Sequence, residues 1–272
     1  MAGWPDHYAQ ANDLNIHYYR TGGSGKPALI LLHGVMDDGL GWVPIARDLQ
    51  EQFDIIMADA RGHGKTGGSL DTFSYKQLAA DVAALIGALD LGQVYLFGHS
   101  MGAMTSALVA ATYPELVRAV VLEDPPFMNA APVQAGDEQR EAQMLKFFQS
   151  ILELRNLPPE QRLAFARQYN PLWDEVELAP WVESKIAFNP AVFQRLERVM
   201  PWREILPRIT CPALLVTGDP ASRAIVTSHT AQEALSLMSR GEVIQIAGAG
   251  HCIHRDRYAE TMPQIQAFLS RV

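Results

Sequence analysis

Six short, mostly apolar runs recur along the chain, and each ends within two residues of a glycine or a polar residue. They cover 28–32, 53–57, 94–97, 117–122, 213–216 and 243–246. Runs of this length with polar boundaries are typical of strands that are buried on both faces of a parallel sheet. The pattern therefore predicts a sheet with both faces covered, which needs helices between the strands.

Helical patterns do lie between the runs. Apolar residues follow a 3.6-residue spacing over 75–89, and 100–111 and 258–269 have helix-forming composition or a similar stripe. The alternating segment 14–18 indicates a half-buried edge strand. Strands that alternate with helices predict an α/β fold, in which functional sites gather at the carboxyl ends of the strands.

The stretch 125–208 breaks this alternation. It holds 10 of the 17 prolines and many aromatic residues. Proline interrupts helices, so we expect short helices here, for example over 138–154 and 159–169. We interpret the stretch as a helical cap inserted between two parts of one core, 1–124 and 209–272.

Composition excludes several classes of protein. Hydrophobic residues make up 48% of the 272, enough for a large core. The formal net charge of −8 argues against a nucleic-acid partner.

The two cysteines, Cys211 and Cys252, form no metal-type cluster, and we interpret Cys252 as a small buried filler. With no signal-like N-terminus and no apolar run near membrane-spanning length, we expect a cytoplasmic protein with no membrane association.

The segment Gly98-His99-Ser100-Met101-Gly102 carries the most specific motif. It matches Gly-x-Ser-x-Gly, follows an apolar run and precedes a helix-forming segment. This context favours a nucleophile elbow, a strained strand-to-helix turn that exposes the serine hydroxyl. A dinucleotide site is not expected from this motif.

A serine nucleophile needs a base and a site for the oxyanion. His251, after the last apolar run, is the best candidate base, whereas His254 should lie in the following turn. We expect His99 to serve packing and His63 to be structural. The oxyanion should rest on the N–H groups of Met101 and Val35, with Met36 as an alternative to Val35.

These motifs resemble the α/β-hydrolase superfamily, in its cap-bearing esterase, lactonase and perhydrolase branch. The matching pieces are His33-Gly34, Asp59-Ala60-Arg61-Gly62-His63-Gly64, the elbow, and Gly248-Ala249-Gly250-His251. The resemblance implies a mostly parallel sheet of eight strands, a Ser-acid-His triad in that chain order, and no cofactor or metal.

The acid departs from the usual family pattern. In the family the triad acid usually lies three residues beyond a glycine, which from Gly218 gives Ala221. Counting back from Ile225 gives Arg223 instead. Neither residue has a carboxylate side chain. Some branches place the acid at the end of the preceding strand, which here gives Asp124. We predict Asp124, with Asp219 as the second choice and Glu123 as the third.

Together these residues predict a serine hydrolase that cleaves an ester-type bond through an acyl-enzyme on Ser100. The aromatic cap indicates a largely apolar small-molecule ester or lactone as substrate. Lactone opening, carbon–carbon bond hydrolysis and perhydrolysis on the same triad remain alternatives. A different class of alternative is a non-catalytic ligand receptor with this fold.

Overall fold

The computed structural model describes residues 3–23, 25–128, 146, 148–197 and 199–272. The chain forms one sheet of eight strands: β1 Asp6–Ala11, β2 Leu14–Arg20, β3 Ala28–Leu32, β4 Asp54–Ala58, β5 Val94–His99, β6 Val117–Glu123, β7 Ala213–Thr217 and β8 Gly241–Gln245. Their spatial order is β1-β2-β4-β3-β5-β6-β7-β8. β2 is antiparallel to both its neighbours, and every pair from β4 to β8 is parallel. This confirms the predicted fold class.

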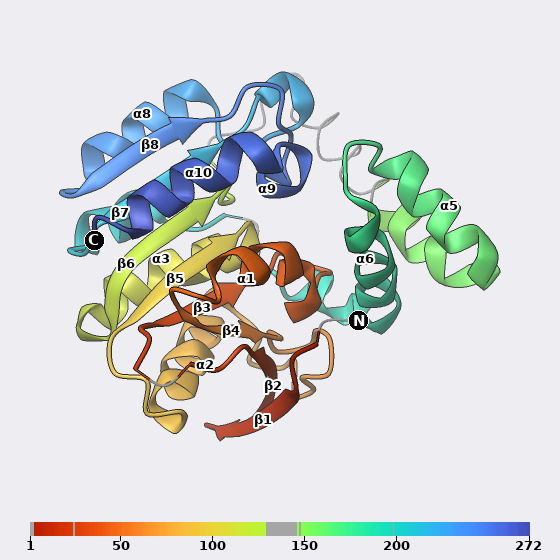
Figure 1. The fold of residues 1–272 in the computed structure, drawn as a ribbon, viewed down its shortest axis with the longest axis horizontal. Coiled ribbons are helices and arrows are strands. Elements are labelled where there is room, and N and C mark those ends of the chain that lie inside the picture. The colour runs from red at the N-terminus through yellow and green to blue at the C-terminus, as the bar shows by residue number, and fades with distance from the viewer. Residues whose placement is uncertain (1–2, 24, 129–145, 147, 198) are drawn as a thin grey trace.

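Alternate residues of the buried strands point to opposite faces, and each face has its own helices. The described helices are α1 Val43–Leu49, α2 Tyr75–Ala88, α3 Met101–Thr112, α5 Pro159–Tyr169, α6 Glu175–Ala187, α7 Trp202–Ile205, α8 Ser228–Leu237, α9 Ile253–Asp256 and α10 Tyr258–Leu269. Leu29 and Leu31 pack with α1 and α10 on one face. Ile30 and Leu32 pack with α2, α3 and α8 on the other. The sheet is thus covered on both faces (Figure 1).

Side-chain caps fix where several of these helices begin. The Ser74 hydroxyl accepts from the Gln77 N–H at the start of α2, and the Asp174 carboxylate accepts from the Val176 N–H at the start of α6. Such caps satisfy N–H groups that have no partner within the helix. The helices predicted over 75–89, 159–169 and 258–269 are confirmed within one residue at each end.

Two strand predictions were wrong in detail. The segment 14–18 belongs to β2, which is not an edge strand because β1 pairs along its outer side. β1 itself escaped prediction, since four of its six residues are exposed and only Ala9 and Ala11 are buried. The last strand, predicted over 243–246, begins at Gly241 and ends at Gln245.

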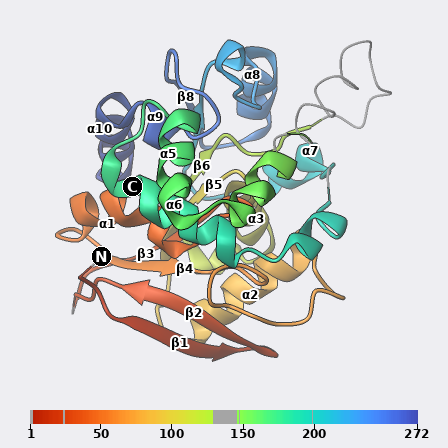
Figure 2. The ribbon, with the colours of Figure 1, turned by 90° about the vertical axis from the view of Figure 1, so that its right-hand side faces the viewer.

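Helices separated by short loops make up most of the described part of the chain between β6 and β7. Residues 148–153 are helical, and α5, α6 and α7 follow. The helix predicted over 138–154 lies partly outside the described residues. In Figure 2 α5 and α6 stand in front of the sheet, on the side toward which the parallel strands point. We call residues 148–197 and 199–208 the insert. Within the described residues, no helix has the length and apolar character needed to span a membrane.

Candidate functional site

The predicted site residues gather at one edge of the sheet. β3, β5 and β6 are parallel neighbours, so the loop after β3, the turn after β5 and the residue after β6 lie side by side. The first carries His33 to Asp37, the second Ser100 and the third Asp124. His251 follows β8 and reaches the same edge, where it contacts Asp124.

Ser100 occupies a strained turn between β5 and α3. Its φ of 53° and ψ of −114° are unusual for a residue with a side chain. The Ser100 N–H donates to the Glu123 carbonyl at 2.9 Å, which holds the turn against β6. Ser100 is the N-cap of α3, yet its hydroxyl makes no capping hydrogen bond. The hydroxyl is therefore not committed to its own helix.

The two glycines of the motif permit this turn. A Cβ atom on Gly98 would lie 2.2 Å from the Gly102 carbonyl oxygen, and one on Gly102 would lie 1.9 Å from the Leu32 carbonyl oxygen. Both separations are far below contact distance, so only glycine fits at either position. The close packing brings the first turn of α3 against the end of β3.

Asp124 and His251 form a close pair. The Asp124 Oδ2 atom lies 2.6 Å from His251 Nδ1. Because a carboxylate accepts, Nδ1 carries the proton and Nε2 is left as an acceptor. Asp124 is fully buried, and its two oxygens also accept from the Ile225 and Val226 N–H groups at 2.8 and 2.9 Å. The carboxylate is fixed by three donors, and it fixes the imidazole.

The two alternative acids are engaged elsewhere. The Asp219 carboxylate accepts from the Ala221 N–H at 2.9 Å and caps a short 3₁₀ helix, Pro220–Ser222. Glu123 bonds to His254, accepting from its Nδ1 at 2.8 Å and from its N–H at 3.1 Å. Of the three candidate acids, Asp124 is the one whose carboxylate meets His251.

The loop after β3 has a fixed peptide orientation. Nε2 of His33 accepts from the Ala60 N–H at 3.0 Å, so Nδ1 carries the proton and donates to the Gly34 carbonyl at 2.8 Å. Burial lowers the pKa of His33, which keeps the ring neutral. The Gly34–Val35 peptide is trans, so the Val35 N–H points opposite to the carbonyl that His33 holds.

The Gly34 and Ser100 segments touch. A Cβ atom on Gly34 would lie 3.4 Å from the Ser100 Cβ and 2.8 Å from His99 Nδ1. The Met101 N–H belongs to the first turn of α3, whose N–H groups have no partner within the helix. Met36, the alternative donor, has a left-handed φ of 68°, and its carbonyl accepts from Lys185 Nζ at 3.0 Å.

The other histidines near the site are buried. His99 Nε2 donates to the His251 carbonyl at 2.9 Å, and burial lowers the pKa of His99 to about 3. His63 donates from Nδ1 to the Arg61 carbonyl, packs against Phe188 of the insert, and has its pKa lowered by burial to about 3. Burial also raises the pKa of the Cys252 thiol, which disfavours the reactive thiolate.

Sequence reasoning missed several contacts of two carboxylates, Asp37 and Asp256, near these residues. Asp37 lies between Arg255 of α9 and Lys185 of α6, with N–O distances of 2.9 and 3.1 Å. The Asp256 carboxylate accepts from the Gly250 N–H and from the Trp173 indole, at 2.7 and 2.8 Å. Three of these four contacts join positions more than 80 residues apart, and the fourth joins Gly250 and Asp256 within one loop, so no sequence spacing signals them.

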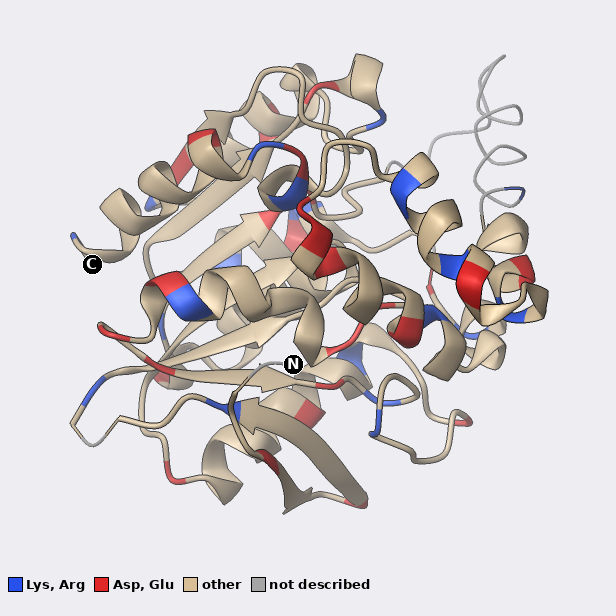
Figure 3. Cartoon of the chain, turned by 45° about the vertical axis from the view of Figure 1, so that its right-hand side comes forward, with Lys and Arg blue, Asp and Glu red and all other residues tan. Residues whose placement is uncertain are grey.

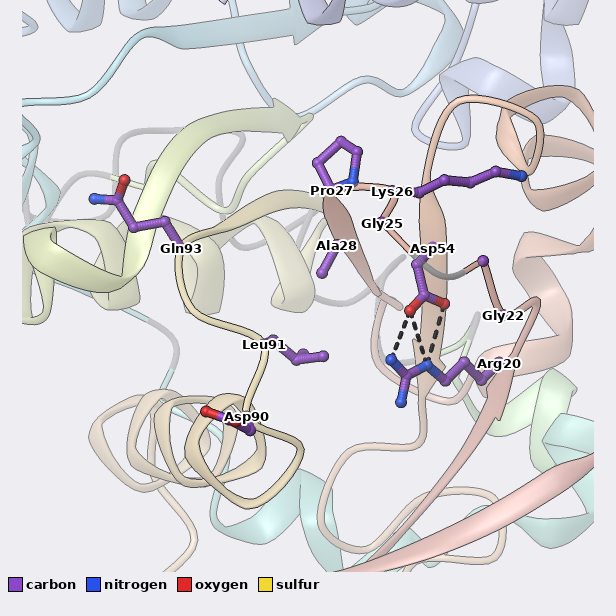
Figure 4. A pocket seen from close by; sticks show the side chains of 11 residues that line it. Arg20, Gly22, Gly25, Lys26, Pro27, Ala28, Asp54, Asp90, Leu91 and Gln93 are labelled. Carbon is purple, nitrogen blue, oxygen red and sulfur yellow. Dashed lines mark hydrogen bonds and ion pairs between the residues drawn. The ribbon is translucent and has the colours of Figure 1, made fainter.

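An open hollow of about 320 Å³ lies away from this site (Figure 4). It is at the amino ends of β3 and β4, beside Ala28 and Asp54, whereas Ser100 is at the carboxyl end of β5. Arg20 donates to both oxygens of Asp54 across its wall. None of the predicted site residues lines it, and ligands of such sheets bind at the opposite edge.

Known proteins share this architecture. A family model described as the alpha/beta hydrolase fold matches residues 27–258. A 2-(acetamidomethylene)succinate hydrolase from Mesorhizobium japonicum is 29% identical over 92% of this chain and 90% of its own length. An N-formylmaleamate deformylase from Pseudomonas putida is 28% identical over 90% and 89%.

Among solved structures, a bacterial membrane phospholipase A superposes with a TM-score of 0.77 at 27% identity. That superposition covers 99% of this chain and 86% of the phospholipase chain. The family model spans well over half of the sequence and includes the segments of Ser100, Asp124 and His251. The chain belongs to the alpha/beta hydrolase fold family.

Proposed function

We propose that the protein is a serine hydrolase that cleaves a carboxylic ester-type bond through an acyl-enzyme on Ser100. The observation that carries this proposal is the 2.6 Å contact between Asp124 and His251 at the edge of the sheet where Ser100 occupies its strained turn. A histidine held by a carboxylate through Nδ1 presents Nε2 as a base, which is the arrangement a serine nucleophile requires.

The reaction has two halves. Ser100 Oγ attacks the acyl carbonyl carbon while His251 Nε2 takes the hydroxyl proton, and the carbonyl oxygen becomes an oxyanion. Collapse of the intermediate expels the alcohol, which leaves with the proton from His251. A water molecule then attacks the acyl-enzyme, again giving its proton to His251, and Ser100 is released with the carboxylic acid.

The oxyanion is stabilised by the N–H groups of Val35 and Met101. His33 fixes the direction of the Val35 N–H by bonding to the Gly34 carbonyl. The Met101 N–H lies at the N-terminal, positive end of the α3 dipole. Donors fixed before the reaction stabilise charge more effectively than water that must reorient. Asp124 keeps the His251 tautomer and stabilises the imidazolium that forms.

The substrate is a small, largely apolar ester or lactone held beneath residues 125–208, which act as a cap over the core of 1–124 and 209–272. Buried aromatic side chains of the insert support this, among them Trp173 and Trp181, whose ring centroids are 6.1 Å apart. The two relatives' names favour a second candidate, hydrolysis of an N-acyl bond, on the same triad.

The test is hydrolysis of p-nitrophenyl esters of graded acyl length by wild type, Ser100→Ala and Ser236→Ala. Ser236 is an exposed serine near the end of α8 and serves as the matched control. We expect Ser100→Ala alone to lose turnover and labelling by a fluorophosphonate. Turnover that survives in Ser100→Ala would contradict the mechanism. A wild type that neither turns over esters or N-acyl substrates nor is labelled would indicate a ligand receptor instead.

A further inference from the structure

A lysine from the insert is buried against the loop after β3. Lys185 is in the last turn of α6 and is 4% exposed. Removing an ammonium group from water is costly unless each of its donors is satisfied. Its Nζ atom bonds to the Met36 carbonyl at 3.0 Å, the Asp37 carboxylate at 3.1 Å and the Ser184 hydroxyl at 3.2 Å. Three donors meet three acceptors, so the ammonium has no capacity left for a substrate.

The residue whose carbonyl Lys185 holds is strained. Met36 has a φ of 68°, in the left-handed region that a residue other than glycine seldom adopts. Strain of this kind persists only where surrounding contacts enforce it. The next residue closes the turn, because the Asp37 N–H donates to the Gly34 carbonyl at 3.2 Å. That carbonyl is the one whose orientation sets the direction of the Val35 N–H.

Asp37 connects this lysine to the segment that carries His251. One carboxylate oxygen accepts from Lys185 and lies 3.2 Å from the Ser184 hydroxyl, whose single proton is shared with the Trp181 carbonyl at 2.8 Å. The other carboxylate oxygen accepts from Arg255, four residues after His251. Burial alone would raise the pKa of Asp37, but Arg255 and Lys185 hold it well below its usual range, so the carboxylate is charged. Figure 3 shows acidic and basic positions close together in the centre of the view.

We propose that Lys185 is a positioning residue that holds loop 33–37 in the conformation in which the Val35 N–H faces the oxyanion. The site is then complete only when α6 of the insert is docked on the core. This inference rests on the proposed function, since it assigns Lys185 to the oxyanion donor of that reaction. The hydrogen-bond partners of Lys185 Nζ do not include Ser100, so Lys185 would act through the Met36 and Asp37 groups that it bonds.

The test compares Lys185→Met with wild type and with Arg162→Met. Methionine keeps the linear side chain and removes the ammonium. Arg162 is a matched control, a cation of the insert that bonds two backbone carbonyls, those of Leu157 and Arg155, without reaching the loop. Rates on a p-nitrophenyl ester are normalised to the concentration of Ser100 that a fluorophosphonate titrates, which removes the contribution of misfolded protein.

A trifluoromethyl ketone provides the discriminating readout, because its adduct with Ser100 places an oxyanion in the site. We expect Lys185→Met to lower kcat roughly 100-fold with KM within about threefold, as for loss or misplacement of one oxyanion donor. Inhibition by the ketone should weaken by about the same factor. Arg162→Met should match wild type in kcat, in KM and in its inhibition by the ketone.

A milder variant covers the case in which Lys185→Met does not fold. Ser184→Ala removes a hydroxyl that bonds both Lys185 and Asp37, and we expect a loss in kcat of about three- to tenfold. Wild-type kcat per titrated serine in either variant, or a loss confined to KM, would overturn the role of Lys185 and leave the serine mechanism intact. Absence of Ser100-dependent turnover in wild type would instead overturn the proposed function and this inference with it.

Discussion

Glu123 and Asp124 are consecutive residues, and each holds a histidine through its Nδ1 atom, yet the two pairs differ in their surroundings. In the Asp124–His251 pair the histidine side chain is 32% exposed, whereas in the Glu123–His254 pair it is 3% exposed. The ring of His254 stacks on Trp42 with centroids 4.9 Å apart. Its Nε2 atom is buried and has no hydrogen-bond partner among the described residues.

The difference teaches that a carboxylate–imidazole contact does not by itself make a reactive base. Both pairs orient the ring in the same way, but only the His251 ring is open to an incoming substrate. The Glu123 contact instead anchors the start of α9, because its carboxylate also accepts from the His254 N–H. This comparison supports the proposal that the exposed pair transfers the proton, while the buried pair anchors the segment that carries His251.

Asp124→Asn should have the largest effect on turnover. The amide no longer fixes the Nδ1–H tautomer of His251 or stabilises its charged form, and we expect kcat to fall by ~10⁴-fold with little change in KM. Ester hydrolysis, together with urea unfolding to confirm a folded variant, measures this. A variant within tenfold of wild type would remove Asp124 from the mechanism.

Glu123→Gln should lower the stability of the protein much more than it lowers turnover. The substitution removes the negative partner of His254 and leaves an amide N–H₂ group buried, so we expect a loss of about 2–3 kcal/mol in the free energy of unfolding. Turnover per titrated serine should fall less than tenfold. Urea denaturation and active-site titration give the two quantities, and a kcat loss as large as that of Asp124→Asn would erase the distinction between the pairs.

The same pair predicts a pH dependence of stability. Burial alone would raise the pKa of Glu123, but His254 lowers it from 4.5 to about 2. A carboxylate with a lowered pKa contributes stability above its unfolded value, and that contribution is lost as pH falls toward the folded value. The stability difference between wild type and Glu123→Gln should therefore be full above pH 5 and shrink between about pH 4.5 and 2. A difference that grows over this range would reverse the assigned sign.

Of these substitutions, Asp219→Asn should have the smallest effect on turnover and on stability. Asparagine still caps the 3₁₀ helix that Asp219 caps, so we expect stability within about 0.5 kcal/mol and kcat within twofold of wild type. Kinetics measured beside Asp124→Asn make the comparison direct. An inactive Asp219→Asn with an active Asp124→Asn would move the acid to the loop after β7.

The sequence predicted those parts of the fold that rest on local pattern. The buried strand β3 is apolar at every position and β4 is apolar after Asp54, and this pattern is visible without any partner. β1 is mostly exposed, and its place is set by pairing with β2, so its residues carry no comparable signal. For the same reason the alternating pattern over 14–18 predicts an edge strand, although β1 pairs along the outer side of β2.

Within the site, the nucleophile elbow is a local motif that the sequence shows directly. The identity of the acid depends instead on contacts between residues far apart in the sequence. Asp124 and His251 are 127 residues apart, and their contact requires the loop after β7 to donate its Ile225 and Val226 N–H groups to Asp124. Lys185 gave no signal, because a lysine in a helix is ordinarily exposed. The catalytic roles of Ser100, Asp124, His251, Val35 and Met101 remain predictions that the experiments above test.

The chain order of the site bears on when activity arises during synthesis. Ser100 and the loop after β3 belong to the first 101 residues, whereas His251 follows β8, which forms the outer strand of the sheet beside β7. A chain emerging from its N-terminus thus acquires the proposed nucleophile more than a hundred residues before the proposed base. In the proposed mechanism the serine stays an ordinary alcohol until β8 pairs and α9 docks, so we expect the growing polypeptide to be inert toward the esters that the finished enzyme would cleave.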